Sequence, residues 1–383
     1  MKKIRRLPAF CLALCFTFFA GCSPAQPPSS PSAEPSSKAS AAEAELIFDH
    51  RMPLDYAECF TVDYYQGGYK KIVLADGMKL LVVPEGAAVP ECEEGVVAVQ
   101  QPVGNLLLTS TPTASLINAL GALDAVSMTT VEAGSWYIDK IKNAVEGGKI
   151  VYVGDHRAPD YEQITAAGVK FAICSGMLKE DVQQQLESLG VTVMFDGAGG
   201  ERHPLGRSEW LKLYGALFNK EKEAEALMAE QKAIVDGLAD LENTRKTVSI
   251  FYITTKGNIY TRCSSDYTAK MVELAGGKYL PEDLAGDSGA VPVEPEAFYE
   301  MAKDADCLVY IWSMGGKPQN LAEVLAQNGI LAELKAVKEG NVWCTAPEYF
   351  QVTDALGAMT ADIRRMLEAG PEEETLTWLY RMR

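Results

Sequence analysis

The residues that could support nucleophilic catalysis lie in the sequence Gly-Asp-Ser-Gly-Ala at positions 286–290. A serine nucleophile also requires a histidine placed as a general base. The chain has three histidines, His50, His156 and His203, and none has the Ala-Ala-His-Cys surroundings that are typical of serine proteases. We therefore interpret positions 286–290 as a solvent-exposed loop and expect no catalytic residues.

Motifs that bind cofactors or metals through a fixed spacing are absent from the sequence. It contains no P-loop, no dinucleotide-binding fingerprint, no Gly-x-Ser-x-Gly elbow and no His-Glu-x-x-His pair. Zinc and manganese sites are commonly built from histidines, and three scattered histidines argue against such a site. We expect neither a cofactor nor a bound metal ion.

The cysteines do not form a recognisable framework. Three of the nine lie at or before position 22, which leaves Cys59, Cys92, Cys174, Cys263, Cys307 and Cys344. An even number permits disulfides outside the cell, but Cys174 and Cys307 lie within apolar strand patterns, where free buried thiols are common. We predict no particular pairing.

Residues 1–22 have the composition of a targeting segment. Basic residues within positions 2–6 precede an apolar run at 7–20, which is shorter than the about 20 residues of a membrane-spanning helix. The run ends in small residues before Cys22. It looks like a bacterial lipoprotein signal with Cys22 as the lipidated first mature residue. The alternative is an ordinary cleaved secretory signal, and either one places the protein outside the cytoplasm.

Residues 23–44 are mostly Ser, Pro, Ala and Glu, and we predict a disordered tether. The formal net charge of the whole chain is −17, and loss of the basic signal makes the remainder more acidic still. Such a surface repels phosphate backbones, so we expect no nucleic-acid partner. No later segment is apolar enough to span a membrane, which leaves the lipid as the only expected anchor.

A helical segment over residues 206–243 lies near the middle of the chain. Its first part, residues 208–218, has Ser208 as a candidate N-cap. One apolar face of this part is formed by Trp210, Leu211, Tyr214, Leu217 and Phe218. The second part, residues 220–241, contains no proline and is rich in good helix formers. Its apolar stripe is Leu227, Met228, Ile234, Val235 and Leu238.

The sequences on the two sides of this helix repeat each other in outline. Each begins with an apolar run, at residues 106–108 and 248–253, that leads through a polar turn into a helix. Each continues with a short acidic helix, a strand, and a final helix and strand. We therefore predict an α/β fold with two Rossmann-like lobes joined by a single long α-helix.

A small β-rich extension precedes the first lobe. Residues 69–83 have the pattern of a hairpin around Asp76-Gly77, and we expect Tyr64, Tyr65 and Tyr69 to form a packing face. The predicted boundaries are a signal at 1–22, a tether at 23–44, the β extension at 45–95, the N-terminal lobe at 96–205, the linker helix at 206–243 and the C-terminal lobe at 244–383.

Several short pieces carry a more specific resemblance. They are Thr-Ser-Thr-Pro-Thr at 109–113, Val-Gly-Asp-His-Arg at 153–157, Leu-Gly-Val-Thr-Val at 189–193 and Met-Val-Glu-Leu-Ala-Gly-Gly at 271–277. With the long helix and the lipoprotein-like signal, they resemble the helix-linked (class III) substrate-binding lipoproteins of ABC importers for iron-siderophores, haem and cobalamin. The extension, and Gly-Val-Lys at 168–170 where the family commonly has Lys-Pro-Asp, depart from that pattern.

The resemblance implies a ligand cleft between the lobes, on loops after the carboxyl ends of strands. Aromatic and arginine side chains there suit a bulky, partly anionic, flat or ringed ligand. Some candidates also have a plain structural interpretation: Thr111 as a helix cap, Trp312 as a core residue and His156 as a turn residue. The candidate ligand-binding residues are Thr109, Ser110, Thr111, Trp136, Tyr137, His156, Arg157, Met177, Arg262, Tyr267, Trp312, Met314 and Tyr349.

The resemblance further implies that the protein captures an iron-siderophore, haem or cobalamin-type ligand and delivers it to an ABC importer permease dimer, without catalysis. The alternatives are a ligand-sensing surface module that meets no transporter, and a secreted hydrolase, which lacks a base and nucleophile pair. For haem, His156 or Met177 could ligate the iron, or Tyr137 or Tyr349 could do so as a phenolate.

The family also docks on its permease through one glutamate on each lobe. By position in the pattern the counterparts are Glu162 and Glu296, with Glu294 as an alternative to the second. The plain interpretation of these residues is an acidic first turn favoured by the helix dipole. Because one long helix joins the lobes, we also expect only a small lobe rotation on ligand binding.

Overall fold

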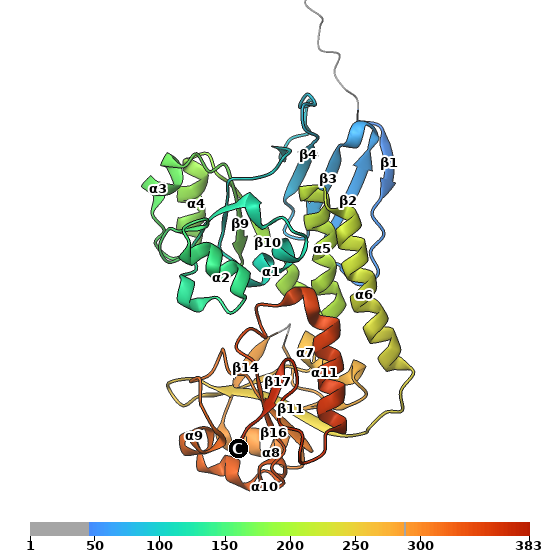
Figure 1. Ribbon diagram of the computed structural model, residues 1–383, viewed down its shortest axis with the longest axis vertical. Coiled ribbons are helices and arrows are strands. Elements are labelled where there is room, and N and C mark those ends of the chain that lie inside the picture. Colours follow the sequence, from blue (N-terminus) through green and yellow to red (C-terminus); the bar gives the residue numbers. More distant parts are fainter. Residues whose placement is uncertain (1–45, 287–288) are drawn as a thin grey trace, which may run out of the picture. The chain divides into compact units, whose positions relative to one another are not determined.

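The computed structural model describes residues 46–286 and 289–383 (Figure 1). The predicted signal and tether, with the lipidation site Cys22, lie outside the described residues, as do Asp287 and Ser288. Within the described part, no helix is both long enough and apolar enough to cross a membrane. Three sheets organise these residues, one in the N-terminal extension and one in each α/β lobe.

The N-terminal extension is a five-stranded sheet in sequence order, with β1 (Phe48–Arg51), β2 (Phe60–Tyr65), β3 (Lys70–Leu74), β4 (Lys79–Val83) and β5 (Val96–Gln100). The first four strands pair antiparallel, and β5 pairs parallel with β4. The β3–β4 pairing confirms the predicted hairpin, in which Gly77 takes a φ of 92° that a residue with a side chain rarely adopts.

The three tyrosines expected on one packing face of the extension are divided between two faces. Tyr64 packs against the large core of the first lobe, whereas Tyr65 and Tyr69 belong to a separate cluster with Leu81 and Val83. Consecutive residues of a strand point to opposite faces, so Tyr64 and Tyr65 cannot share one. The expectation of a single tyrosine face was wrong for this reason.

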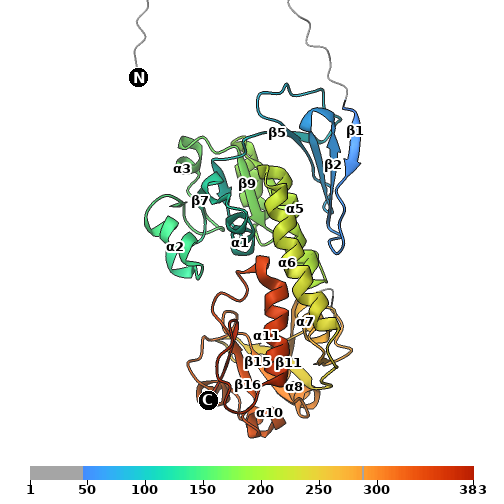
Figure 2. The same cartoon turned by 45° about the vertical axis from the view of Figure 1, so that its right-hand side comes forward.

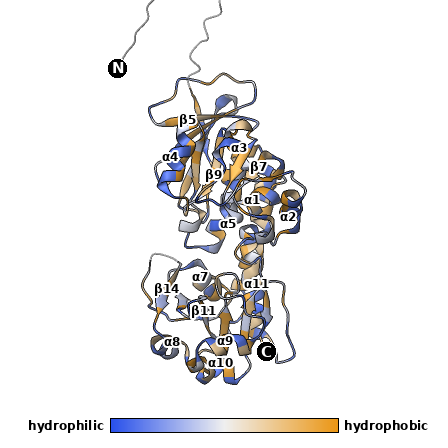
Figure 3. Cartoon of the chain, turned by 90° about the vertical axis from the view of Figure 1, so that its left-hand side faces the viewer, coloured by the Kyte–Doolittle hydropathy of each residue, from blue (hydrophilic) through white to orange (hydrophobic). Residues whose placement is uncertain are grey.

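The first lobe has a fully parallel sheet in the order β10-β9-β6-β7-β8. Its strands are β6 (Leu106–Leu108), β7 (Val126–Thr129), β8 (Val151–Tyr152), β9 (Phe171–Ser175) and β10 (Thr192–Asp196). Its helices are α1 (Thr111–Ala119), α2 (Asp139–Glu146), α3 (Tyr161–Ala166) and α4 (Glu180–Ser188). The central strands are almost wholly buried, as strands covered on both faces are. Figure 3 shows β9 as hydrophobic and α4 as largely hydrophilic.

The second lobe has a mixed sheet in the order β14-β12-β11-β15-β16-β17, with β13 beside β11. Its strands are β11 (Thr247–Ile253), β12 (Ile259–Arg262), β13 (Lys278–Leu280), β14 (Ala290–Val293), β15 (Cys307–Tyr310), β16 (Val342–Thr345) and β17 (Leu379–Arg381). Its helices are α7 (Tyr267–Leu274), α8 (Pro295–Ala302), α9 (Leu321–Gln327), α10 (Lys335–Lys338) and α11 (Leu356–Glu368). The parallel core β11-β15-β16 matches β6-β9-β10 of the first lobe.

The helical segment between the lobes consists of two helices, α5 (Pro204–Phe218) and α6 (Glu221–Ala239). Asn219 takes a left-handed conformation with φ 56° and ends α5. α6 then folds back against α5, so closely that a Cβ on Gly215 would lie 2.9 Å from the Cβ of Ala224. Figure 1 shows the two helices side by side, and Figure 2 shows α6 running on toward α7 and α11. α6 continues to α11 of the second lobe, where Gln231 Oε1 accepts a hydrogen bond from the Ala358 N–H.

The start of α5 differs from the prediction. The helix begins at Pro204, and His203 Nδ1 accepts a hydrogen bond from the Leu205 N–H at 3.2 Å. Ser208, expected as the N-cap, lies inside the helix and donates its hydroxyl to the Thr353 carbonyl at 2.7 Å. The expectation was wrong because a proline at the first helical positions fixes an earlier start.

Two buried glutamates, Glu209 in α5 and Glu201 just before its start, hold the extension. The carboxylate of Glu209 accepts hydrogen bonds from the backbone N–H groups of Asp55, Tyr56 and Ala57 at 2.8–3.0 Å. Glu201 likewise accepts from the N–H groups of Glu58 and Cys59. The extension therefore covers the side of α5 that the sequence predicted to be polar, and α5 is buried on nearly all sides instead of being amphipathic.

Candidate functional site

A cleft of about 490 Å³ is lined by residues of both lobes. The first lobe contributes Thr109, Ser110, Thr111, Pro112, Ser175, Gly176, Met177, Asp196, Ala198, Gly199 and Arg207 of α5. The second lobe contributes Arg262, Tyr267, Met314, Tyr349, Phe350, Thr353 and Leu356. Most first-lobe residues follow the carboxyl ends of β6, β9 and β10, where open α/β sheets bind their ligands.

A fixed carboxylate lies on the first-lobe side of the cleft. Asp196 Oδ2 accepts a hydrogen bond from the Tyr214 hydroxyl at 2.6 Å, and Oδ1 accepts one from the Ala198 N–H at 2.8 Å. Thr113 Oγ1 lies 2.6 Å both from Asp196 Oδ2 and from Ser110 Oγ. Complete burial and the charge of Asp196 raise the pKa of Tyr214, which therefore remains a neutral donor. These contacts hold Asp196 in place.

The N-cap of α1 belongs to the same group of residues. Ser110 Oγ accepts a hydrogen bond from the Thr113 N–H, so Ser110 caps α1 and Thr111 is its first residue. The helix cap is therefore Ser110, and not Thr111 as the alternative interpretation had it. The Thr109 hydroxyl in turn accepts a hydrogen bond from the Ser175 N–H at 2.9 Å, which ties the loops after β6 and β9 together.

Arg262 is buried and neutralised by its own lobe. Its Nε and Nη2 donate to Asp266 Oδ1 and Oδ2 at 3.0 and 2.6 Å, a bidentate pair. Asp266 also accepts hydrogen bonds from the N–H groups of Thr268 and Gly289. Burial acts to raise the pKa of Asp266, but the charge of Arg262 and the hydrogen bonds from Arg262 and Thr268 together outweigh burial and hold the pKa below its usual value. Arg262 thus presents donors to the cleft with its charge already balanced.

Arg207 is placed differently, because it carries an unbalanced charge into the cleft. Its Nη2 and Nε donate to the carbonyl oxygens of Gly199 and Glu201 at 2.7 and 3.0 Å. Its guanidinium carbon lies 3.8 Å from the ring centroid of Tyr267, a cation–π contact between the lobes. Among the described residues, no carboxylate lies within ion-pair distance of it. An anionic ligand would supply the missing charge.

The second lobe also supplies an aromatic wall of Tyr267, Tyr349 and Phe350. Tyr349 and Phe350 lie 5.3 Å apart between ring centroids, and the Arg262 guanidinium carbon is 5.7 Å from the Phe350 ring. Burial raises the pKa of both Tyr267 and Tyr349. Both phenols are therefore neutral, and neither is prepared to act as a phenolate ligand.

Two methionines add apolar surface to the cleft. Met177 of the first lobe has 76% of its surface exposed, and Met314 of the second lobe has 40%. Methionine side chains adapt to irregular apolar surfaces because they are flexible and polarizable. The methionines and the aromatic wall together favour a ligand with a sizeable apolar body.

Five of the predicted ligand-binding residues lie outside this lining. Trp136 is a core residue with 2% exposure, and its indole N–H donates to the Val131 carbonyl. Arg157 is exposed and pairs with Asp155, at 2.7 Å between Nε and Oδ1, and His156 lies beside the same carboxylate. Tyr137 and Trp312 pack edge to face against each other, 5.8 Å between ring centroids.

Tyr137 and Trp312 instead belong to a seam where the lobes touch. Gln351 Nε2 donates to the Ser135 carbonyl at 2.7 Å, and its Oε1 accepts from the Tyr137 N–H at 3.0 Å. The Thr353 N–H donates to Ser115 Oγ at 3.0 Å. This second connection supplements α6, so the lobes are held together along one side of the cleft.

The residues predicted from the sequence did not include Arg207, Asp196, Thr353 and Leu356, which also line the cleft. A signal existed for Asp196, which directly ends an apolar strand, as polar site residues often do. Arg207 had no such signal, because it lies in the first turns of a helix and meets Tyr267 only through tertiary contact.

Comparison with known proteins assigns the chain to a family. Residues 107–349, from β6 to the aromatic wall, match the family described as periplasmic binding protein, and the chain belongs to this family. Members of the family bind solutes and are not enzymes.

Two relatives are lipoproteins of unassigned role from Methanocaldococcus jannaschii. One is 27% identical over 346 residues, which cover 86% of each chain. The other is 26% identical over 297 residues, covering 74% of this chain and 70% of the relative. The relative that covers 86% of this chain matches more residues than the two lobes and the linker contain, so this match extends into the N-terminal extension.

Solved structures share the fold at low identity. The periplasmic haem-binding protein BhuT with two haems has a TM-score of 0.55 at 17% identity, covering 68% of this chain and 97% of its own. The haem-binding protein HutB of Vibrio cholerae has 0.54 at 18%, covering 67% and 98%. An ABC-type Fe3+-hydroxamate transport protein of Saccharomonospora viridis has 0.54 at 19%, covering 69% and 93%. The predicted helix-linked two-lobe fold is confirmed.

Proposed function

We propose that this protein is the extracytoplasmic receptor of an ABC importer and that its cleft captures a bulky, anionic metal chelate or tetrapyrrole, of the iron-siderophore, haem or cobalamin type. The observation that carries the proposal is Arg207, a cation stacked on Tyr267 without a carboxylate partner among the described residues. An anion bound there would gain a charge-assisted contact without breaking an existing ion pair.

The rest of the lining supports a large ligand. A volume of about 490 Å³ lies within the range of about 300–1,000 Å³ common for small-molecule sites. Tyr349 and Phe350 offer ring faces on one side, and the two methionines offer apolar surface. The names of similar structures, which include haem-binding and Fe3+-hydroxamate transport proteins, point to the same ligand classes.

Within that class, a ligand that completes its own metal coordination fits best. The lining contains no histidine, and burial keeps Tyr267 and Tyr349 protonated. His156 lies outside the lining, and Tyr137 belongs to the seam between the lobes. Met177 and Met314 offer only thioethers. The lining therefore favours a ferric siderophore or a corrinoid, which needs no protein ligand, over direct ligation of a haem iron.

Docking on a permease dimer is part of the proposal. Glu162 and Glu296 are exposed, and each stands in the first turn of a helix, α3 or α8. Each helix leads into the strand that pairs parallel with the first strand of its lobe, β9 with β6 and β15 with β11. The two carboxylates thus occupy equivalent places in the two lobes. A lipid on Cys22 would keep the receptor at the membrane surface.

The test is a thermal-shift panel of ferric siderophores, haem and cobalamins. A ligand that binds only the native state raises stability by RT ln(1 + [L]/Kd). For a ligand that shifts the melting temperature, Arg207→Ala should weaken binding about tenfold or more and Arg207→Lys should restore part of it. The matched control is Arg202→Ala, which removes an exposed arginine outside the cleft lining.

Two results would refute the proposal. One is a panel without any shift while a neutral sugar or peptide stabilises the protein. The other is an equal loss of ligand affinity in Arg207→Ala and Arg202→Ala, because Arg207 would then contribute no more than any positive charge on the surface.

A further inference from the structure

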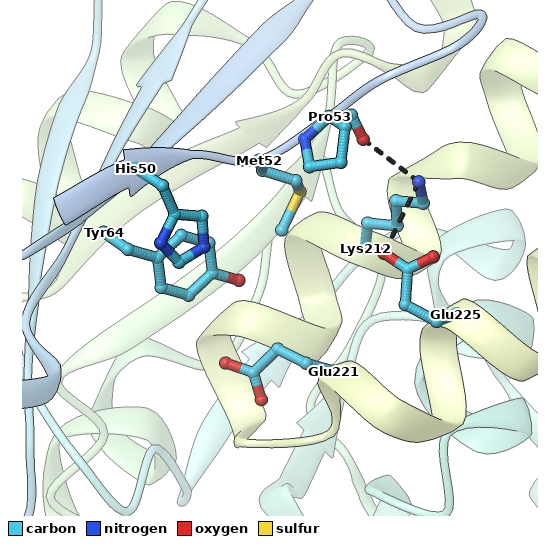
Figure 4. A pocket seen from close by; sticks show the side chains of 7 residues that line it. All are labelled: His50, Met52, Pro53, Tyr64, Lys212, Glu221 and Glu225. Atoms are coloured by element: carbon cyan, nitrogen blue, oxygen red, sulfur yellow. Dashed lines mark hydrogen bonds and ion pairs between the residues drawn. The ribbon is translucent and has the colours of Figure 1, made fainter.

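A second pocket lies between the N-terminal extension and the α5–α6 pair, and it shares no lining residue with the cleft (Figure 4). Its volume of about 250 Å³ is below the range typical of drug-sized ligands. His50 and Tyr64 come from the extension, and Glu221 and Glu225 come from α6. The pocket has room for a small molecule or a single side chain.

One wall of this pocket is aromatic and apolar. The rings of His50 and Tyr64 stack with centroids 4.6 Å apart and planes 6° from parallel. Met52 lies next to them, and Figure 4 shows the Tyr64 hydroxyl pointing into the space between Met52 and Glu221. His50 is more than half exposed, so the stack is accessible from solvent. Such a wall suits the carbon chain of a ligand, because aromatic and thioether side chains pack well against apolar groups.

The facing wall is acidic and incompletely neutralised. Glu221 pairs with Lys70 at 2.5 Å. Glu225, one helical turn further on, is 3.5 Å from Lys212 Nζ. Lys212 is shared, since it also lies 3.3 Å from buried Glu209 and donates to the Pro53 carbonyl at 3.0 Å. Lys70 and Lys212 therefore pair with three carboxylates, those of Glu221, Glu225 and Glu209, which leaves one negative charge in excess.

The negative charges of the facing wall affect Tyr64 in the aromatic wall. Burial raises the pKa of Tyr64, and the charges of Glu221 and Glu225 raise it further. The hydroxyl is therefore neutral and can accept a hydrogen bond from a cation. A metal ion is less suited to the pocket, because no group of three His, Cys, Asp or Glu side chains within residues 46–286 and 289–383 is arranged to hold one.

We propose that this pocket binds a small organic cation, an alkylammonium or guanidinium group. The positive group lies between Glu225 and Glu221, within reach of the Tyr64 hydroxyl, and its carbon chain lies against Met52 and the His50–Tyr64 stack. The site is separate from the cleft, and the inference does not depend on which ligand the cleft takes.

The test is isothermal titration calorimetry on the mature protein with four probes. n-Butylammonium tests whether an alkyl chain that carries an ammonium group binds, and 1-butanol is its uncharged control. Putrescine represents a free diamine, and Nα-acetyl-lysine methylamide represents a lysine carried by a protein. The three cations should bind with one site per chain and 1-butanol should not. The tighter of putrescine and the lysine derivative identifies the source of the cation.

Variants locate the binding. Glu225→Gln should weaken cation binding about tenfold, and because Glu225 is more than half exposed, the melting temperature should stay close to that of the parent protein. Glu230→Gln, an exposed carboxylate on the same helix but outside the pocket, should have no effect. Phe350→Ala in the cleft should also have none.

Four results would overturn the proposal. They are no heat from any cation at millimolar concentration, equal binding of 1-butanol, equal weakening by Glu230→Gln and Glu225→Gln, and loss of binding in Phe350→Ala. The third would indicate general attraction to an acidic surface, and the fourth would place the cation in the cleft.

Discussion

Removal of the Glu209 carboxylate tests how the extension is attached. Glu209 is buried in α5 and accepts backbone hydrogen bonds from Asp55, Tyr56 and Ala57. Lys212 lies 3.3 Å away and is itself almost buried. Glu209→Ala would therefore leave three N–H groups without their acceptor and remove one of the two carboxylates paired with Lys212. We expect it to be among the most destabilising single substitutions outside the apolar core.

The magnitude follows from these contacts. A hydrogen bond to a charged group contributes about 1.5–3 kcal/mol. Three such bonds are not additive, and the 55–57 loop is only partly buried, so water can replace part of the loss. We therefore expect about 3–5 kcal/mol, the range found when one partner of a buried ion pair is removed. For a chain of this size the melting temperature should fall on the order of 10 °C.

Urea denaturation of the parent and three variants measures this loss. Glu209→Gln keeps the shape and one acceptor oxygen, so it should fall between the parent and Glu209→Ala. Glu58→Ala is the matched control, because Glu58 is an exposed glutamate in the same loop. If Glu209→Ala costs less than about 1 kcal/mol, or no more than Glu58→Ala, the buried carboxylate does not hold the extension.

Three further expectations follow from the structure. Burial raises the pKa of Asp354, whose Oδ1 has no hydrogen-bond partner in the described part. Above its pKa in the folded protein, the ionised carboxylate therefore destabilises the folded state. Asp354→Asn should raise the melting temperature at neutral pH but not in acid, where the carboxyl group of the parent protein is protonated. An equal rise in melting temperature at both pH values would contradict this. The double variant Glu162→Ala and Glu296→Ala should leave ligand affinity unchanged while abolishing permease-stimulated ATP hydrolysis. ATP hydrolysis at the level of the parent protein would show that these carboxylates serve only the first turns of their helices. Small-angle scattering should show little compaction on ligand binding, since α6 and the Gln351 seam both hold the lobes.

The general fold could be predicted from local pattern. Apolar runs such as 106–108 and 248–253 must be buried on both faces, which dictates central strands, and Asp76-Gly77 dictates a hairpin turn. The sequence pattern also divided the helical segment at Asn219, into parts at 208–218 and 220–241, but it did not show that α6 folds back against α5. The close contact between Gly215 and Ala224 decides it, and that contact is tertiary.

The candidate site was predictable where strand ends determine it. Thr109 and Met177 follow strands and Arg262 ends one, and the topology brings those ends into the cleft. Position after a strand does not fix the direction of a side chain, however, and Arg157 turns to Asp155 instead. Arg207 was missed because its place beside Tyr267 depends on how the two lobes approach each other.

The two glutamates that hold the extension have a consequence for how the chain folds as it is synthesised. The loop that they bind is made first, but Glu201 and Glu209 follow it by 142 to 154 residues. The five strands can pair early, yet one face of their sheet stays uncovered until α5 has been made. Contacts between residues so far apart in sequence form slowly. Incomplete chains that lack α5 should therefore expose this apolar sheet face.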